Sequence, residues 1–431
     1  MLDRRQILAA GLALPAATAL ASCGPNASGG NGGGDGSPSL RFTWWGNSTR
    51  HELTQQVVDD YTTREEAPAI STEPGEWSGY WDKLATQTAG GDAPDIIQMD
   101  EKYMAEFGTR GQLLDLGAAG FDTSSFAEGT VPVGELGDGQ LVGINAGINA
   151  FSVIANPAVF EAAGIDLPDD TTWTWDELLD IAARITSATD GGTYGVNQIG
   201  LNETTFHVYL RQLGLDRYEG GGLAFDAAAA TEYYEFVQTI QDSGAGPEAS
   251  LAIEDGAAGF DQSRFNTGRA AMTVALSNQA VAHHDAVSTG IEILRPPSLT
   301  GSAADVGLWY KASMYWSISA NAADPEAALD FVDFLSNSTD AGTILSVERG
   351  VPPNLEVREA ITPDLDDINL RVVEYLESIE GELGPAPELT PPGAGELMNI
   401  INRAGEDMLF GTITPAEAGA RLVEELEAAI S

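Results

Sequence analysis

Aromatic, amide and carboxylate side chains gather in five short segments of the sequence, at the ends of expected strands or in loops. A pyranose ring stacks its C–H face on an aromatic ring, and its hydroxyls need donors and acceptors such as Asn, Asp and Glu. This mixture favours a non-catalytic binding site for a sugar. The candidate residues are Trp44, Trp45, Asn47, Trp77, Tyr80, Trp81, Asp100, Glu101, Asn278, Trp309 and Tyr310.

Each candidate also has an ordinary structural interpretation. Trp44 and Trp45 are adjacent, so in a strand their side chains point to opposite faces and one of them belongs to the core. Trp77, Tyr80 and Trp81 could form the apolar side of a helix that packs on a sheet. The prediction therefore rests on the cluster of segments and not on any single ring.

Three other functions stay open on the residues alone. A glycosidase needs two carboxylates about 5–9 Å apart, and with 65 acidic residues pairs such as Asp100 and Glu101 arise by chance. A polyamine or quaternary amine would also suit acidic and aromatic surroundings. A sugar acid would need an arginine in the site, for which Arg50, Arg264 and Arg349 are candidates.

The charge balance excludes several classes of partner. The chain has 20 Lys and Arg against 65 Asp and Glu, a net charge of −45. Such a surface repels the phosphates of nucleic acids and anionic lipid headgroups. The adjacent His283 and His284 diverge and lack a cysteine partner, so they do not predict a metal site. We expect no nucleic acid, no metal and no cofactor.

Strand and helix signals alternate along the chain from residue 40 onward. The run Leu40–Trp45 is typical of a strand. Thr174 and Glu177 form a capping box that begins a helix, and Asp324 followed by Pro325 begins another. Alternation without a repeat predicts an α/β architecture, in which ligands bind beyond the carboxyl ends of the strands.

The first residues carry export signals. Arg4-Arg5 followed by an apolar run is typical of a signal peptide over residues 1–22, with the twin-arginine and general secretory routes both open. Cys23 stands in a sequence that resembles a lipobox, whose cysteine carries a diacylglyceryl anchor. Residues 23–39 are rich in Gly and Ser and predict a flexible tether. We expect a lipid-anchored protein at the extracellular face of the cell membrane.

Longer stretches of the chain resemble the family 1 extracellular solute-binding proteins of carbohydrate ABC importers, the maltose-binding-protein-like group. The matching stretches are FTWWGN near the start and residues 75–116, 143–168, 172–185, 265–275, 310–337 and 348–354. Together they cover the chain from about residue 40 nearly to the C-terminus. Their order, with the lipobox before them, makes the resemblance specific.

The resemblance implies a two-lobed, type II periplasmic-binding-protein-like fold. Each lobe is expected to be a sheet flanked by helices, with the ligand held in a cleft between the lobes. By this resemblance, residues 40–149 and 264–312 form the N-terminal lobe. Residues 150–263 and 313–431 form the C-terminal lobe.

The resemblance also implies how the protein works. It implies a binding protein, not an enzyme, that captures a sugar or oligosaccharide by closure of its lobes and delivers it to an ABC importer permease. Asn47, Asn149 and Asn278 fall at ligand-contact positions of the family. Asn47-Ser48 replaces the charged pair of malto-oligosaccharide binders, which argues against maltose. We expect a monomer; the alternative ligand is a non-sugar solute such as a polyamine or quaternary amine.

Overall fold

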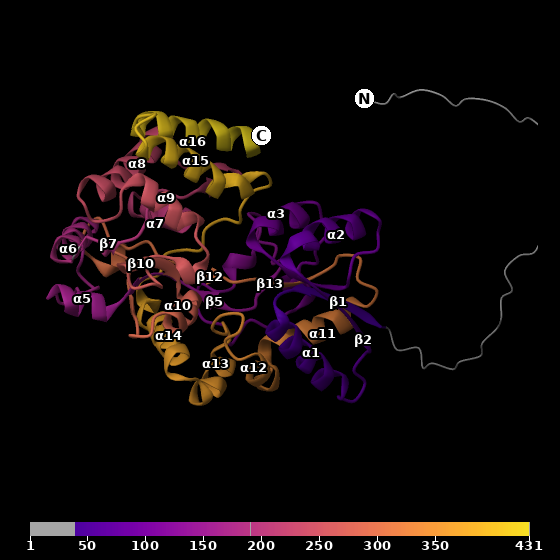
Figure 1. Cartoon of the computed structure of the whole chain (residues 1–431). Helices are drawn as coiled ribbons and strands as arrows, with labels where there is room; N and C mark the ends of the chain where they lie inside the picture. The colour runs from indigo at the N-terminus through magenta and orange to yellow at the C-terminus, as the bar shows by residue number, and fades with distance from the viewer. Residues whose placement is uncertain (1–38, 190, 431) are drawn as a thin grey trace, which may run out of the picture. The chain divides into compact units, whose positions relative to one another are not determined.

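Figure 1 shows the computed structural model of the chain, which describes residues 39–189 and 191–430. The expected signal peptide, the lipidation at Cys23 and the tether as far as residue 38 lie outside the described residues. Within residues 39–189 and 191–430, every helix is too short or too polar to span a bilayer.

Five strands form the first sheet in the order β2-β1-β3-β13-β4. Figure 1 labels three of them, β1, β2 and β13. Their bounds are β1 Leu40–Trp45, β2 Ile70–Gly75, β3 Ile96–Met99, β4 Ile144–Asn145 and β13 Tyr315–Ile318. β1 lies parallel to β2 and β3, whereas β13 is antiparallel to β3 and β4. Because side chains alternate along β1, Trp44 enters the core on one face and Trp45 the core on the other.

Helices cover both faces of this sheet. The face that Trp44 enters is packed by α1 (Ser48–Thr62), α4 (Leu116–Ala119), α11 (Pro325–Asn337) and α12 (Thr339–Leu345). The opposite face is packed by α2 (Trp77–Ala89) and α3 (Glu101–Thr109). The predicted start of α11 is confirmed, because the side chain of Asp324 accepts a hydrogen bond from the Ala327 amide. We call this sheet and its helices the first lobe.

Four strands form the second sheet in the order β11-β6-β10-β7. Their bounds are β6 Phe151–Ala155, β7 Tyr194–Val196, β10 Ala270–Leu276 and β11 Glu292–Leu294. β6 is antiparallel to both β10 and β11, and β10 is parallel to β7. β10 is the longest strand and lies inside the sheet, as its apolar sequence AAMTVAL predicts.

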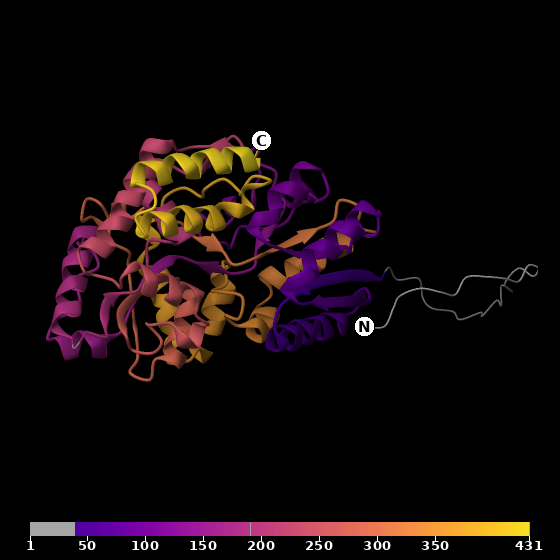
Figure 2. The same ribbon diagram turned by 45° about the horizontal axis from the view of Figure 1, so that its top comes forward.

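Helices also cover both faces of the second sheet. One core contains residues of α5 (Pro157–Ala163), α6 (Trp175–Ala188), α7 (Glu203–Gln212), α8 (Ala227–Asp242), α9 (Ala249–Ala257), α15 (Leu397–Leu409) and α16 (Pro415–Ile430). The other contains residues of α10 (Ala280–Ala286) and α14 (Asp367–Ser378). The capping box of Thr174 and Glu177 is confirmed at the start of α6. Figure 2 shows α15 and α16 packed side by side. We call this sheet and its helices the second lobe.

The chain crosses between the lobes in a narrow ribbon. β5 (Ile148–Asn149) and β12 (Lys311–Ala312) pair antiparallel, with Asn149 opposite Lys311. A third segment joins them where Val351 bridges to Ile148, before α13 (Leu355–Ile361). Gly147 permits this approach, because a Cβ there would lie 2.1 Å from the carbonyl oxygen of Arg349.

The strand pairing contradicts the expected lobe assignment of two segments. Residues 264–312 were expected in the first lobe, but β10 and β11 from this range belong to the second sheet. Residues 313–431 were expected in the second lobe, but β13 pairs with β3 and β4. The reason is backbone pairing: β10 is buried between β6 and β7, and its amides and carbonyls must bond to them. The predicted two-lobed α/β fold is itself confirmed.

Candidate ligand-binding cleft

A cavity of about 290 Å³ lies where the two lobes meet the crossing ribbon. The first lobe contributes the start of α3, the ribbon contributes β5 and β12, and the second lobe contributes α7 and the segment after β10. We call this cavity the cleft. Its lining residues are Asp100, Glu101, Lys102, Asn149, Glu203, Thr204, His207, Arg217, Leu276, Asn278, Trp309, Lys311, Ala312, Ser313, Met314 and Thr390.

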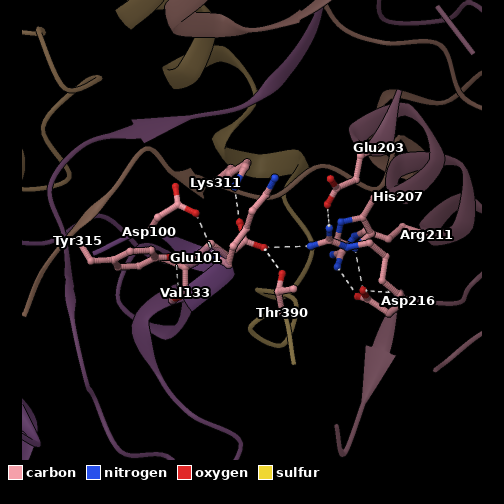
Figure 3. A network of polar contacts seen from close by, with 12 residues as sticks. Asp100, Glu101, Val133, Glu203, His207, Arg211, Asp216, Lys311, Tyr315 and Thr390 are labelled. Carbon is pink, nitrogen blue, oxygen red and sulfur yellow. Dashed lines mark hydrogen bonds and ion pairs between the residues drawn. The ribbon is translucent and has the colours of Figure 1, made fainter. Parts of the chain in front are cut away.

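Glu101, the first residue of α3, occupies the centre of a polar network (Figure 3). Its Oε1 accepts hydrogen bonds from Arg217 at 3.0 Å and from Thr390 at 3.3 Å, and its Oε2 is paired with Lys311. Burial raises the pKa of Glu101, but the positive charges of Lys311 and Arg217 outweigh burial and hold the pKa below its usual range. Glu101 is therefore ionised and joins the first lobe to the second.

Asp100 precedes Glu101 and caps the same helix. Its side chain accepts a hydrogen bond from the Lys102 amide at 3.0 Å, which satisfies a free donor of the first turn. Burial raises the pKa of Asp100, and the charge of Lys311 opposes this rise. The N-terminus of α3 favours negative charge at both positions. The sequence pointed to both carboxylates, and the structure places both on the cleft wall.

Arg217 supplies the opposite charge from the second lobe and is only 5% exposed. It donates to Glu203 at 2.6 Å as well as to Glu101. Burial lowers the pKa of Arg217, but these two carboxylates more than offset that effect and raise it. Its Nε is buried without a hydrogen-bond partner among the described residues. One donor of the guanidinium thus stays unused.

His207 of α7 forms part of the wall behind Arg217. Its Nε2 lies 2.7 Å from Asp216 Oδ1, and Arg211 donates to the other oxygen of the same carboxylate at 2.9 Å. Burial lowers the pKa of His207 to about 3, so the ring is neutral near pH 7. Because Nε2 is the ring nitrogen that faces the carboxylate, the neutral ring of His207 carries its proton on Nε2. The ring centroid lies 4.2 Å from that of Trp309, which also lines the cleft.

Asn149 lies in the crossing ribbon and is fully buried. Its Nδ2 donates to Ser313 Oγ at 2.5 Å, while its Oδ1 has no hydrogen-bond partner in the described part of the chain. Buried polar atoms are nearly always paired in folded proteins. The cleft wall therefore holds an unused acceptor on Asn149 and an unused donor on Arg217.

Four aromatic rings form a cluster beside the cleft, which we call the aromatic shelf (Trp45, Trp77, Trp81 and Tyr103). Trp81 stacks on Tyr103 with centroids 3.8 Å apart, and Trp45 contacts Trp77 at 5.2 Å and Trp81 at 5.3 Å. Trp77 is 46% exposed. Tyr103 belongs to the same helix as Glu101, and Met314 packs in the adjoining core and lines the cleft. The shelf and the cleft are therefore neighbours.

Three predicted aromatic residues are core residues instead. The indole N–H of Trp44 donates to a histidine ring of α1 at 3.1 Å. The hydroxyl of Tyr80 donates to the Gln98 carbonyl at 2.9 Å, and that of Tyr310 to a carbonyl of α14 at 3.1 Å. Each of the three is buried with its polar atom bonded inside the core, which is its ordinary structural role, and a contact with a ligand stays a prediction.

The remaining predicted residues lie in several places. Asn278 is exposed just after β10 and lines the cleft, as do Asn149 and Trp309. Asn47 does not line it; its side chain accepts a hydrogen bond from the Arg50 amide at 2.9 Å and caps α1. Their roles in binding a ligand stay predictions.

The three arginines considered for a sugar acid lie away from the cleft. Arg50 is paired with Glu348 at 2.8 Å, and the buried Arg349 approaches the same carboxylate at 3.2 Å. The guanidinium of Arg264 lies 5.5 Å from the ring of Tyr194. None of the three is among the described lining residues of the cleft.

Sequence reasoning missed much of the second-lobe wall. Glu203 was visible only as a first-turn acid of a helix, and Arg217 precedes a two-residue strand, β8 (Tyr218–Glu219), without any motif. Lys311 directly follows the candidate Tyr310, and Tyr103 lies two residues after the candidate Glu101, but the residue types of Lys311 and Tyr103 did not select them as site residues. The described residues contain no group of three or more His, Cys, Asp or Glu that could hold a metal ion.

Comparisons with known proteins identify the family and the fold. The family model described as Bacterial extracellular solute-binding protein matches residues 45–341. A Streptomyces antibioticus protein named "Uncharacterized lipoprotein in oleD 5'region" is 26% identical over 193 residues, which are 41% of this chain and only 38% of that relative. A maltooligosaccharide ABC transporter solute-binding lipoprotein of Streptococcus pneumoniae is 21% identical over 396 residues, 86% of this chain and 85% of that protein.

A solved structure shows the same architecture. The extracellular solute-binding protein family 1 from Alicyclobacillus acidocaldarius is 25% identical, with a TM-score of 0.75. The alignment covers 91% of this chain and 98% of that one. The family match extends over more than half of the sequence and includes strands of both sheets. The chain belongs to the bacterial extracellular solute-binding protein family.

Proposed function

We propose that this protein binds a neutral sugar or short oligosaccharide in the cleft and delivers it, while anchored to the membrane through Cys23, to the permease of an ABC importer. The observation that carries the proposal is the pair of unused polar atoms, Asn149 Oδ1 and Arg217 Nε, on the wall of the cleft. A ligand with hydroxyls can donate to the first and accept from the second. The named sugar of the Streptococcus pneumoniae relative supports the same class of ligand.

The charges of the cleft support a neutral ligand. Its lining holds three carboxylates and three cationic side chains, which balance: Asp100, Glu101 and Glu203 against Lys102, Arg217 and Lys311. A polyamine would meet no excess of negative charge there. A sugar acid would find two of the three cations engaged, because Arg217 and Lys311 already pair with Glu101 and only Lys102 has no ion pair with another described residue.

The same contacts support binding without hydrolysis. A glycosidase needs a carboxylic acid whose raised pKa lets it donate a proton, opposite a second, free carboxylate. Glu101 has a lowered pKa, and both of its oxygens are occupied by Arg217 and Lys311. Glu203 is bonded to Arg217. The pKa of Asp100 is raised, as a proton donor requires, but the other two carboxylates of the cleft, Glu101 and Glu203, are both paired with Arg217.

The aromatic shelf supports a ligand longer than the cleft. The cleft volume of about 290 Å³ lies at the lower end of the ~300–1,000 Å³ typical of ligand pockets. Trp77 and the stacked pair of Trp81 and Tyr103 would offer ring faces to sugar units that extend from the cleft. Trp77 is 46% exposed although it contacts three other aromatic rings, and an exposed apolar cluster of this kind is typical of a binding surface.

A thermal-shift screen tests the proposed function. We expect at least one neutral sugar, from a panel of glucose, maltose, maltotriose and cellobiose, to raise the melting temperature, and spermidine and galacturonate not to raise it. A ligand selective for the folded state adds about 2.7 kcal/mol of stability at 100 times its Kd. A shift with spermidine or galacturonate and none with the neutral sugars would contradict the proposal.

Asn149→Ala should weaken binding of the sugar that the screen identifies. The variant removes the unused acceptor, and we expect Kd to rise by about tenfold or more. A buried hydrogen bond contributes roughly 0.5–1.5 kcal/mol, and a ligand donor left unpaired costs more. Isothermal titration calorimetry measures the change. Asn197→Ala is the matched control, since Asn197 Oδ1 is also unpartnered but lines a different cavity. If both variants bind the sugar with the affinity of the wild type, Asn149 does not contact the ligand.

Trp81→Ala should weaken binding of an oligosaccharide by at least about tenfold, because the shelf loses its stacked ring face and a tenfold change is about 1.4 kcal/mol. The same titration on a single sugar unit should show a smaller loss. Trp44→Phe serves as the control for a general effect of altering an aromatic residue in this lobe, because Trp44 lies in the core. Unchanged curves for Trp81→Ala, with the protein folded, would exclude the shelf.

A further inference from the structure

A proline-rich segment follows α14 and has no helix or strand, which we call the strap (Leu383–Pro392). It reads LGPAPELTPP, with four prolines among ten residues. Proline fixes φ and lacks an amide hydrogen, so such a sequence neither joins a sheet nor forms a helix, and it stays extended and stiff. The strap is therefore stiffer than a glycine-rich loop, so that a displacement of one of its ends also moves the other.

One end of the strap is attached to the second lobe. Leu383 packs against the core that contains Trp309 and Tyr310. The Gly384 amide donates to the Leu308 carbonyl at 2.7 Å. Further along, Arg211 donates to the Pro385 carbonyl at 2.8 Å. The Glu388 carboxylate accepts a hydrogen bond from the Gly220 amide at 3.1 Å. These contacts hold the strap on the lobe from which it emerges.

The middle of the strap reaches the first lobe. Ala386 and Leu389 pack against the core that contains Trp45 and Tyr315. Thr390 is buried and its hydroxyl donates to Glu101 Oε1 at 3.3 Å (Figure 3). A segment of the second lobe thus makes apolar and polar contacts with the first lobe beside the cleft.

The strap also closes one end of the cleft. Pro387, Glu388 and Leu389 face a void that Glu101 and Lys311 line on the other side. The void measures about 10 Å³, which is at most the ~10–15 Å³ that one water molecule needs and leaves no room for a sugar unit. A ligand in the cleft therefore meets a wall at this end.

We propose that the strap is a clasp that holds the first lobe against the second and forms the end wall of the cleft, with Leu389 and Thr390 as its positioning residues. Separation of the lobes must draw Leu389 from the first-lobe core, because the strap stays bonded to the second lobe. The proposal rests on the contacts between the lobes and does not depend on which solute the cleft binds.

The distance between the lobes tests this proposal without any ligand. Spin labels are placed on the full chain at Ala85→Cys in α2 and Glu424→Cys in α16, both exposed, with Cys23→Ser as the background. Pulsed electron paramagnetic resonance then gives the distance distribution. Leu389→Ala should raise the ratio of long to short distances by roughly tenfold, as expected when a partly buried leucine loses apolar contacts across the lobes.

Leu383→Ala is the matched control, because it makes the same substitution in the same segment but on the second-lobe core. We expect it to leave the distances unchanged. Thr390→Val, which removes the hydrogen bond to Glu101, should shift the distances in the same direction as Leu389→Ala. It replaces Leu389→Ala in the test if Leu389→Ala does not fold. Wild-type distances in folded Leu389→Ala and Thr390→Val, or an equal shift in Leu383→Ala, would overturn the clasp. Failure of sugars to bind would leave this result unaffected.

Discussion

The arrangement of the two lobes depends on the carboxylate of Glu101. A buried carboxylate is costly unless it is paired and hydrogen-bonded. Glu101 meets this requirement with Arg217 from the second lobe and Lys311 from the crossing ribbon. Arg217 lies 116 residues and Lys311 lies 210 residues from Glu101 in the sequence, and both converge on its carboxylate. The cleft is the space that this convergence leaves.

The chemistry of the cleft follows from the same pairing. Because Glu101 engages Arg217 and Lys311 and the charges that line the cavity balance, no strong net charge faces it, and much of the wall offers hydrogen bonds. Asn149 Oδ1 and Arg217 Nε are the two atoms that the network leaves unpaired. The aromatic shelf lies next to them because Tyr103 is on the same helix as Glu101. Polar cleft and ring faces together are what a sugar requires.

The sequence predicted local structure well because its signals are local. The apolar strand Leu40–Trp45 and the capping box of Thr174 and Glu177 formed where they were expected. The lobe assignment failed at β10, since a strand sequence does not state which sheet will pair with it. Tyr80 shows a similar limit for the site: its place between Trp77 and Trp81 in the sequence suggested a ligand contact, yet its hydroxyl bonds inside the core. Contacts such as that of Arg217 with Glu101 arise only in three dimensions.

Hydrogen–deuterium exchange with and without the bound sugar tests the central claim most directly, because it reports each lobe separately. If the ligand lies between the lobes and engages both, amides should gain protection at the start of α3, around Glu101 and Tyr103, and also at the start of α7, around Glu203 and His207. Protection confined to one lobe, or located away from the cleft, would contradict the account.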